Sequence, residues 1–173
     1  MGKLRRVSTA TIVFLLAVSV LIMGPFLIAS GEGTDNGLNS LSFKIDGNHM
    51  GEQAVYQYWF DHVNTENEVF RMTTTSKDED TVLLEWIVIK GEKAFYKDSE
   101  NTGGTWQTIP YSESLWVQIR DAVLGGKGVD FWRGIEGEEE YIIVRGEDGE
   151  EEEVKLYDIS VNEPIEESTF QPE

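Results

Sequence analysis

Ala54–Val63 reads AVYQYWFDHV, with large aromatic side chains at alternate positions. Side chains at alternate positions of an extended chain lie on the same face. Three aromatic residues share one face in this way: Tyr56, Tyr58 and Phe60. Because period-two alternation is typical of a β-strand with one buried face, we predict a strand here.

Further strand-like runs lie on both sides of this stretch. Thr81–Lys90 (TVLLEWIVIK) is apolar at successive positions, which indicates a central strand covered on both faces. The remaining runs are separated by short turn sequences such as GNHMG, KDED and NTGG, and Asp148-Gly149 is a strong hairpin signal. These runs are Leu41–Ile45, Glu68–Thr75, Ala94–Tyr96, Thr105–Ile109, Val129–Trp132, Tyr141–Arg145 and Val154–Val161. Short turns between successive strands predict an antiparallel meander.

One helix is expected after residue 38. Ser112 can cap it, and Gly125-Gly126 can end it. Its apolar residues are spaced three and four apart: Leu115, Trp116, Ile119, Ala122 and Val123. We therefore predict an α+β fold that is mostly β, with a curved antiparallel meander sheet of about seven strands wrapped round one helix.

The chain begins with a segment directed to a membrane. Lys3, Arg5 and Arg6 precede an uncharged run from residue 7 to residue 31. Its apolar core is long enough for a transmembrane helix, but small residues near Ala29 also suit a signal-peptide cleavage site. Residues 1–30 are thus predicted to be either a transmembrane anchor or a cleaved signal peptide.

The rest of the chain is expected outside the cytoplasm. By the positive-inside rule, the basic end stays in the cytoplasm and the residues after the apolar run are translocated. Residues 31–37 (GEGTDNG) read as a flexible linker, and residues 38–173 as one exported β-rich domain. We expect this domain at the extracytoplasmic side of the cell membrane, or secreted if the segment is cleaved.

The exported part is strongly acidic. All 32 acidic residues and 11 of the 14 basic residues lie beyond residue 31, which gives that part a formal charge of −21. Such a surface repels nucleic acid, so no nucleic-acid partner is expected. There is no cysteine, so the core must hold without disulfides.

No catalytic constellation stands out. His49 lies in a predicted turn and His62 at a strand end, and we interpret both as surface or edge residues. No serine lies in a nucleophile-elbow motif. The acidic runs 138–140 and 147–153 lack the spacing of a calcium loop, which favours a solvated hairpin over a metal site. We predict a non-enzymatic protein with no catalytic residue, metal or cofactor.

Glu85 is the one acid inside the apolar run Thr81–Lys90. Buried acids are normally paired, and Arg71 lies within a neighbouring predicted strand. We therefore expect Glu85 either to pair with a Lys or Arg of a neighbouring strand, with Arg71 as the candidate partner, or to lie at the rim of the sheet.

An apolar cavity is the remaining candidate site. A curved sheet that does not close tightly around its helix leaves a pocket for an apolar ligand. Its walls would come from two strands and the helix, through Tyr56, Tyr58, Phe60, Leu84, Trp86, Trp116 and Ile119. The alternative is that these residues simply fill the core.

Three stretches of the chain share the pattern of one known family. Val69–Met72 reads VFRM, and Glu85–Ile89 is followed by further aromatic residues. The tail Asp158–Gln171 (DISVNEPIEESTFQ) has an N-x-P…F ending. These stretches resemble the "fRm" strand, the paired strands and the ending of the bacterial outer-membrane lipoprotein carrier (LolA-like) superfamily, and the ending is the most specific of the three. The chain looks more like short exported archaeal proteins of unknown role, which share its Tyr-Trp strand and this ending. The resemblance covers about half of the exported part.

The resemblance implies an incomplete β-barrel with a helical lid over a cavity that receives acyl chains. It also implies that Arg71 helps to hold the lid, which adds Arg71 to the candidate ligand site. We therefore expect a membrane-proximal domain that binds lipid or another apolar ligand. The alternative is a structural or adhesion-type surface domain with a filled core.

Overall fold

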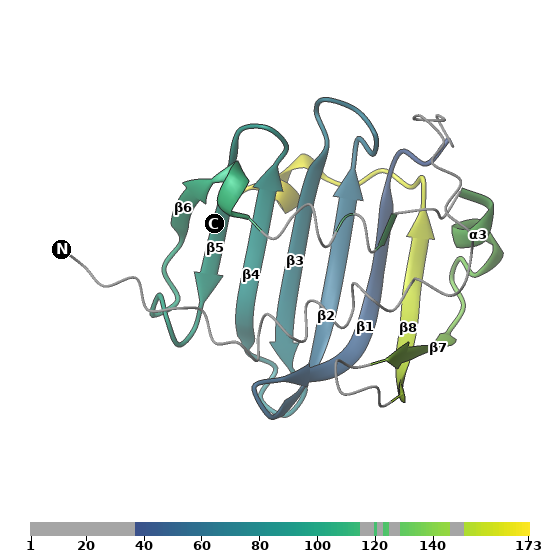
Figure 1. Cartoon of the computed structure of the whole chain (residues 1–173), viewed down its shortest axis with the longest axis horizontal. Coiled ribbons are helices and arrows are strands. Elements are labelled where there is room, and N and C mark those ends of the chain that lie inside the picture. Colours follow the sequence, from purple (N-terminus) through teal and green to yellow (C-terminus); the bar gives the residue numbers. More distant parts are fainter. Residues whose placement is uncertain (1–36, 115–119, 121–122, 125–128, 146–150) are drawn as a thin grey trace.

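The computed structural model describes residues 37–114, 120, 123–124, 129–145 and 151–173. Within them, one antiparallel sheet of eight strands has the order β6-β5-β4-β3-β2-β1-β8-β7 (Figure 1). In the described part of the chain β6 and β7 do not pair with each other, so the sheet is open. The strands are β1 (Leu41–His49), β2 (Glu52–Asp61), β3 (Val69–Ser76), β4 (Val82–Ile89), β5 (Lys93–Asp98), β6 (Gln107–Pro110), β7 (Glu140–Arg145) and β8 (Glu151–Val161).

The sheet grows outward from β1 in both directions. From β1 to β6 each strand pairs with the next along the chain, as short turns predict. β8 pairs with the other side of β1, with Leu41 opposite Val161, and β7 lies outside β8. The connection from β6 to β7 therefore leads from one edge of the sheet to the other.

The strand register places alternate residues on two faces. One row across β1 to β5 pairs Phe43, Tyr58, Met72, Trp86 and Tyr96 in turn, and we call the side that carries this row the core face. Most of the buried hydrophobic cluster lies on this face. Burying one such large side chain contributes about 1.5–3 kcal/mol, so this face dominates the stability of the domain.

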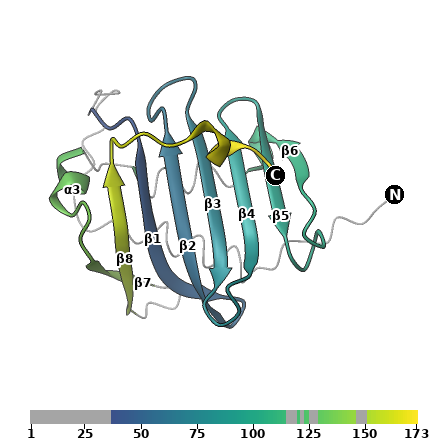
Figure 2. The same cartoon turned by 180° about the vertical axis from the view of Figure 1, so that it is seen from behind.

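The opposite side of the sheet, which we call the tail face, carries Arg71, Glu85 and Lys97 on β3, β4 and β5. The C-terminal residues 162–173 cross it, with a short 3-10 helix, η2 (Glu167–Phe170), against β3 (Figure 2). Asn162 fixes the start of this tail, because its side chain accepts from the Asn39 amide at 2.7 Å and donates to the Gly37 carbonyl at 2.9 Å. The tail thus covers part of the second face of the sheet.

Several sequence predictions are confirmed. The described domain is mostly β, antiparallel and meandering, with eight strands where about seven were expected. β4 is buried on both faces, since Val88 on the core face and Ile87 on the tail face are both inaccessible to water. An apolar run without alternation therefore did indicate a doubly covered strand.

The strand predicted at Val129–Trp132 is wrong. Val129–Gly134 forms a short helix, α3, which packs against β8. Val129 and Trp132 are three residues apart and share one side of a helical turn, and Trp132 is the buried residue of α3. A four-residue run is too short to distinguish period two from period 3.6.

Other predictions fall wholly or partly outside the described residues. These are the N-terminal segment 1–30, most of the linker, the Asp148-Gly149 turn, and Leu115, Trp116, Ile119 and Ala122 of the predicted helix. Arg120, Val123 and Leu124 are helical, but Ser112 lies inside a 3-10 turn, η1 (Tyr111–Glu113), instead of capping an α-helix. Among the described residues, no helix is long and apolar enough to cross a membrane.

Candidate functional site

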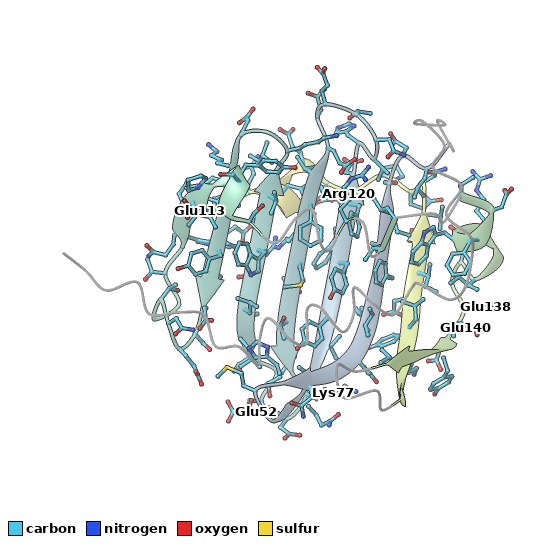
Figure 3. All side chains as sticks on the ribbon, viewed as in Figure 1. Glu52, Lys77, Glu113, Arg120, Glu138 and Glu140 are labelled. Carbon is cyan, nitrogen blue, oxygen red and sulfur yellow. The ribbon has the colours of Figure 1, made fainter. Side chains whose placement is uncertain are left out.

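Five of the predicted ligand-site residues lie together on the core face. Tyr56, Tyr58 and Phe60 come from β2, and Leu84 and Trp86 from β4. β3 lies between these strands and contributes Phe70 and Met72, both fully buried, to the same face. Figure 3 looks onto this face, where aromatic rings from several strands lie side by side. Trp116 and Ile119 lie outside the described residues.

Aromatic rings form a continuous layer over β1, β2 and β3. Phe43 stacks on Tyr58 with ring centroids 5.0 Å apart, and Trp132 of α3 stacks on Phe43 at 5.2 Å. Phe60 and Phe70 are 5.0 Å apart on the neighbouring row. The sequence prediction missed Phe43, Phe70 and Trp132 as members of the layer. The alternation of Leu41–Ile45 was a usable signal for Phe43, whereas Trp132 was hidden by the wrong strand assignment.

Towards β5 the core face becomes partly accessible. Trp86 of β4 stacks on Tyr96 of β5 at 5.2 Å, and both rings are half-buried. Ile109 and Tyr111, beyond them along the same edge, are also half-buried and pack on the core. The apolar layer therefore runs from a fully buried region on β1–β3 to a partly open margin on β4–β6.

Three buried polar atoms on the core side have no hydrogen-bond partner among the described residues: the Tyr58 hydroxyl, Thr74 Oγ1 and Trp132 Nε1. Tyr56 differs, because its hydroxyl donates to the Asn48 carbonyl at 2.9 Å. Burial raises the pKa of Tyr58, so its hydroxyl remains a protonated donor at physiological pH.

A buried ion pair ties the β6–β7 connection to the turn between β2 and β3. Arg120 Nε donates to Glu68 Oε1 at 2.6 Å, and its Nη2 donates to Glu68 Oε2 at 3.2 Å and to Asn64 Oδ1 at 2.6 Å. The Glu68 side chain is completely buried. Arg120 stands near the ends of β2 and β3 (Figure 3). This pair was not predicted, since residues 52 positions apart carry no local signal.

The predicted pair of Glu85 and Arg71 is confirmed. Arg71 Nη2 donates to Glu85 Oε1 at 2.6 Å, and Lys97 Nζ bonds the other carboxylate oxygen. Burial alone would raise the pKa of Glu85, but the hydrogen bonds from Lys97 and Arg71 outweigh it and hold this pKa below its ordinary value. Arg71 also donates to the Thr169 carbonyl at 2.8 Å. Arg71 is thus bound to the tail, on the opposite face from the other candidate residues.

The two histidines have different surroundings. The His62 side chain is more than half exposed, as predicted. The surface assignment of His49 is wrong, because this residue ends β1 and is buried, with Nδ1 3.4 Å from the Tyr56 hydroxyl. Burial lowers the pKa of His49, which keeps the ring neutral near pH 7.

A cavity of about 220 Å³ lies beneath the start of the tail. Its lining residues are Leu41, Ser42, Trp59, Ser160, Glu163, Pro164, Ile165 and Glu166. None of the predicted ligand-site residues lines this cavity. Its carboxylates and serines make it unsuited to a purely apolar ligand.

Comparison of the chain with family models, curated proteins and solved structures found no match. Within the described residues, no group of three His, Asp or Glu side chains is arranged to hold a metal ion. Function is therefore inferred from the chain's own residues, and the apolar layer on the core face is the candidate site.

Proposed function

We propose that this chain is a non-enzymatic binding protein of the extracytoplasmic side of the cell membrane. Its ligand is a lipid or another molecule with an apolar chain, bound against the core face. One observation carries the proposal: the aromatic layer continues from fully buried rings on β1–β3 to the half-buried stack of Trp86 on Tyr96. The apolar chain of a ligand that enters beside this stack contacts rings that are already packed on one another, as in a largely pre-formed apolar site.

The proposal extends to the shape of the site. We propose that the open sheet acts as an incomplete barrel, as the resemblance to lipoprotein carriers implies. β6 and β7 are the two edge strands of the described sheet and do not pair with each other, as expected for an incomplete barrel. The N-terminal segment, as anchor or signal peptide, would bring the domain to the membrane surface, where such ligands occur.

A structural or adhesion-type domain is the second candidate. It is favoured by the packing over β1–β3, where Phe43, Tyr58, Phe60 and Phe70 are all at most 1% exposed. In that case the rings would only fill the core.

The two candidates differ in their response to a charge at the margin of the core face. The full chain, in lipid vesicles, is exposed to a photoactivatable monoacylglycerol, and labelled peptides are quantified by mass spectrometry. Trp86→Glu should reduce labelling of the β2–β5 peptides several-fold, because a carboxylate opposes entry of an apolar chain. Phe95→Glu is the matched control, since Phe95 is equally half-buried but lies on the tail face of β5.

Labelling of those peptides that survives Phe95→Glu and falls with Trp86→Glu supports the binding role. If the β2–β5 peptides of the unaltered chain take up no label, the ligand proposal fails and the filled-core candidate replaces it.

A further inference from the structure

The unpaired polar atoms of the core face point to the chemistry of the ligand. Tyr58 and Thr74 are completely buried and Trp132 is 1% exposed. Within the described structure, neither of the two hydroxyls nor the indole N–H has a hydrogen-bond partner. Buried polar groups in native proteins are nearly always hydrogen-bonded. Three exceptions on one side of one sheet call for a partner that the described residues do not supply.

These residues are linked by nearest-neighbour contacts. Thr74 is paired with Tyr56 across β2 and β3, which makes Thr74 the diagonal neighbour of Tyr58 on the same face. Phe43 stacks on Tyr58, and Trp132 stacks on Phe43. The three polar groups therefore belong to one patch inside the aromatic layer.

The hydrogen-bonding capacity of the patch selects for an acceptor. An indole N–H can only donate, and a protonated tyrosine or threonine hydroxyl can donate. Arg71 of β3 and Lys97 of β5 lie on the tail face and are engaged by Glu85. A charged ligand group would enter this apolar patch without a counter-ion from these residues, at a high desolvation cost.

We propose that the ligand is amphipathic and that it presents an uncharged acceptor, such as an ester or amide carbonyl, to the hydroxyls of Tyr58 and Thr74. The Trp132 indole is the third donor of the patch. This inference rests on the proposed ligand-binding function. It adds that the site recognises a polar group in the part of the ligand that is buried against the core face. A ligand with only a hydrocarbon chain therefore binds more weakly.

A matched pair of probes tests this recognition. The full chain in vesicles is labelled with a photoactivatable monoacylglycerol, which has an ester carbonyl, or with its alkyl-ether counterpart, which lacks the carbonyl. Tyr58→Phe and Thr74→Val each remove a hydroxyl and keep the shape of the side chain. Each should weaken binding of the ester by about two- to tenfold, the value of one hydrogen bond, and leave the ether unchanged. Tyr157→Phe is the control, because that hydroxyl donates to Asp46 and lies on the tail face, outside the proposed site.

The outcomes separate the two proposals. Equal loss for ester and ether, or no loss for either, overturns the acceptor proposal while the binding function stands. Absence of core-face labelling by both probes in the unaltered chain overturns the binding function itself.

The ligand-free protein provides a second test that does not depend on a probe. Because the Tyr58 hydroxyl has no partner in the described structure, its removal should leave the denaturation midpoint of the delipidated chain unchanged or higher. Tyr56→Phe should lower that midpoint, since it abolishes an existing hydrogen bond. A midpoint that falls as far for Tyr58→Phe as for Tyr56→Phe would show that the hydroxyl is satisfied internally, and the proposal would be abandoned.

Discussion

At the scale of single residues, Glu85 is the most constrained charge on the tail face. Its side chain is 4% exposed, and two cations bind its two oxygens. The sequence predicted Arg71 as a partner, because a lone acid in an apolar strand needs a cation. Lys97 could not be predicted, since its position opposite Glu85 depends on the register of β4 and β5.

Removing Arg71 tests the importance of this pair for stability. Arg71→Leu should lower the free energy of unfolding by about 3 kcal/mol, because a buried carboxylate loses one partner and the Thr169 carbonyl loses its donor. Urea denaturation followed by tryptophan fluorescence measures the loss. Lys97→Met is the comparison, with a smaller expected loss because it removes one contact and leaves Arg71 bound to both Glu85 and the Thr169 carbonyl. Equal losses for the two variants would contradict this assignment.

The Glu85 carboxylate also makes the stability of the fold depend on pH. The hydrogen bonds from Lys97 and Arg71 outweigh the opposing effect of burial, so the pKa of Glu85 is lower in the folded state than its ordinary value of 4.5. Its contribution to stability is therefore complete above pH 4.5 and is lost as the pH falls through the folded pKa. The stability difference between the unaltered chain and Glu85→Gln should be constant above pH 4.5 and shrink below it. A difference that does not change with pH would contradict the depressed pKa.

At the scale of elements, the ion pair with Glu68 fixes Arg120, a residue of the β6–β7 connection, to the turn between β2 and β3. Arg120→Gln leaves the fully buried Glu68 without its cation and should cost about 3 kcal/mol of unfolding free energy. In a double-mutant cycle with Glu68→Gln, the combined loss should be well below the sum of the single losses, because both changes remove the same interaction. Additive losses would mean that the two residues act independently.

The C-terminal tail is a second element whose attachment can be measured. Phe170 is buried and belongs to η2, which packs on β3. Phe170→Ala should cost about 2 kcal/mol and increase hydrogen exchange in residues 162–173. Glu167→Ala, an exposed change in the same turn, should have almost no effect. Unchanged exchange in the tail of Phe170→Ala would show that other contacts hold it.

Element type was predictable where the apolar pattern was long. Ala54–Val63 and Thr81–Lys90 each carry eight or more residues of consistent pattern, and both are strands within two residues of the predicted limits. Val129–Trp132 carries only four residues, and its assignment was wrong. His49 was wrong for a related reason: it follows a turn-like Gly-Asn sequence, but β1 extends through it and buries the ring.

At the scale of the whole molecule, the meander was predictable, whereas the pairing that extends the sheet beyond β1 was not. Short turns dictate that β1 to β6 follow one another, whereas the pairing of β8 with β1 joins residues more than 100 positions apart. The division between core face and tail face follows from alternation along each strand. That division separated Arg71 from the other candidate residues, although the sequence grouped them.

The distribution of cross-links from a lipid probe is the most direct test of a ligand site on the core face. The full chain in vesicles is irradiated with a photoactivatable monoacylglycerol, and the modified residues are identified by mass spectrometry. We predict cross-links at core-face positions of β2–β5, such as Met72, Trp86 and Tyr96, and none at the tail-face positions Trp59 and Phe95. Cross-links confined to the N-terminal apolar run, or distributed equally between the two faces, would contradict a ligand site on the core face.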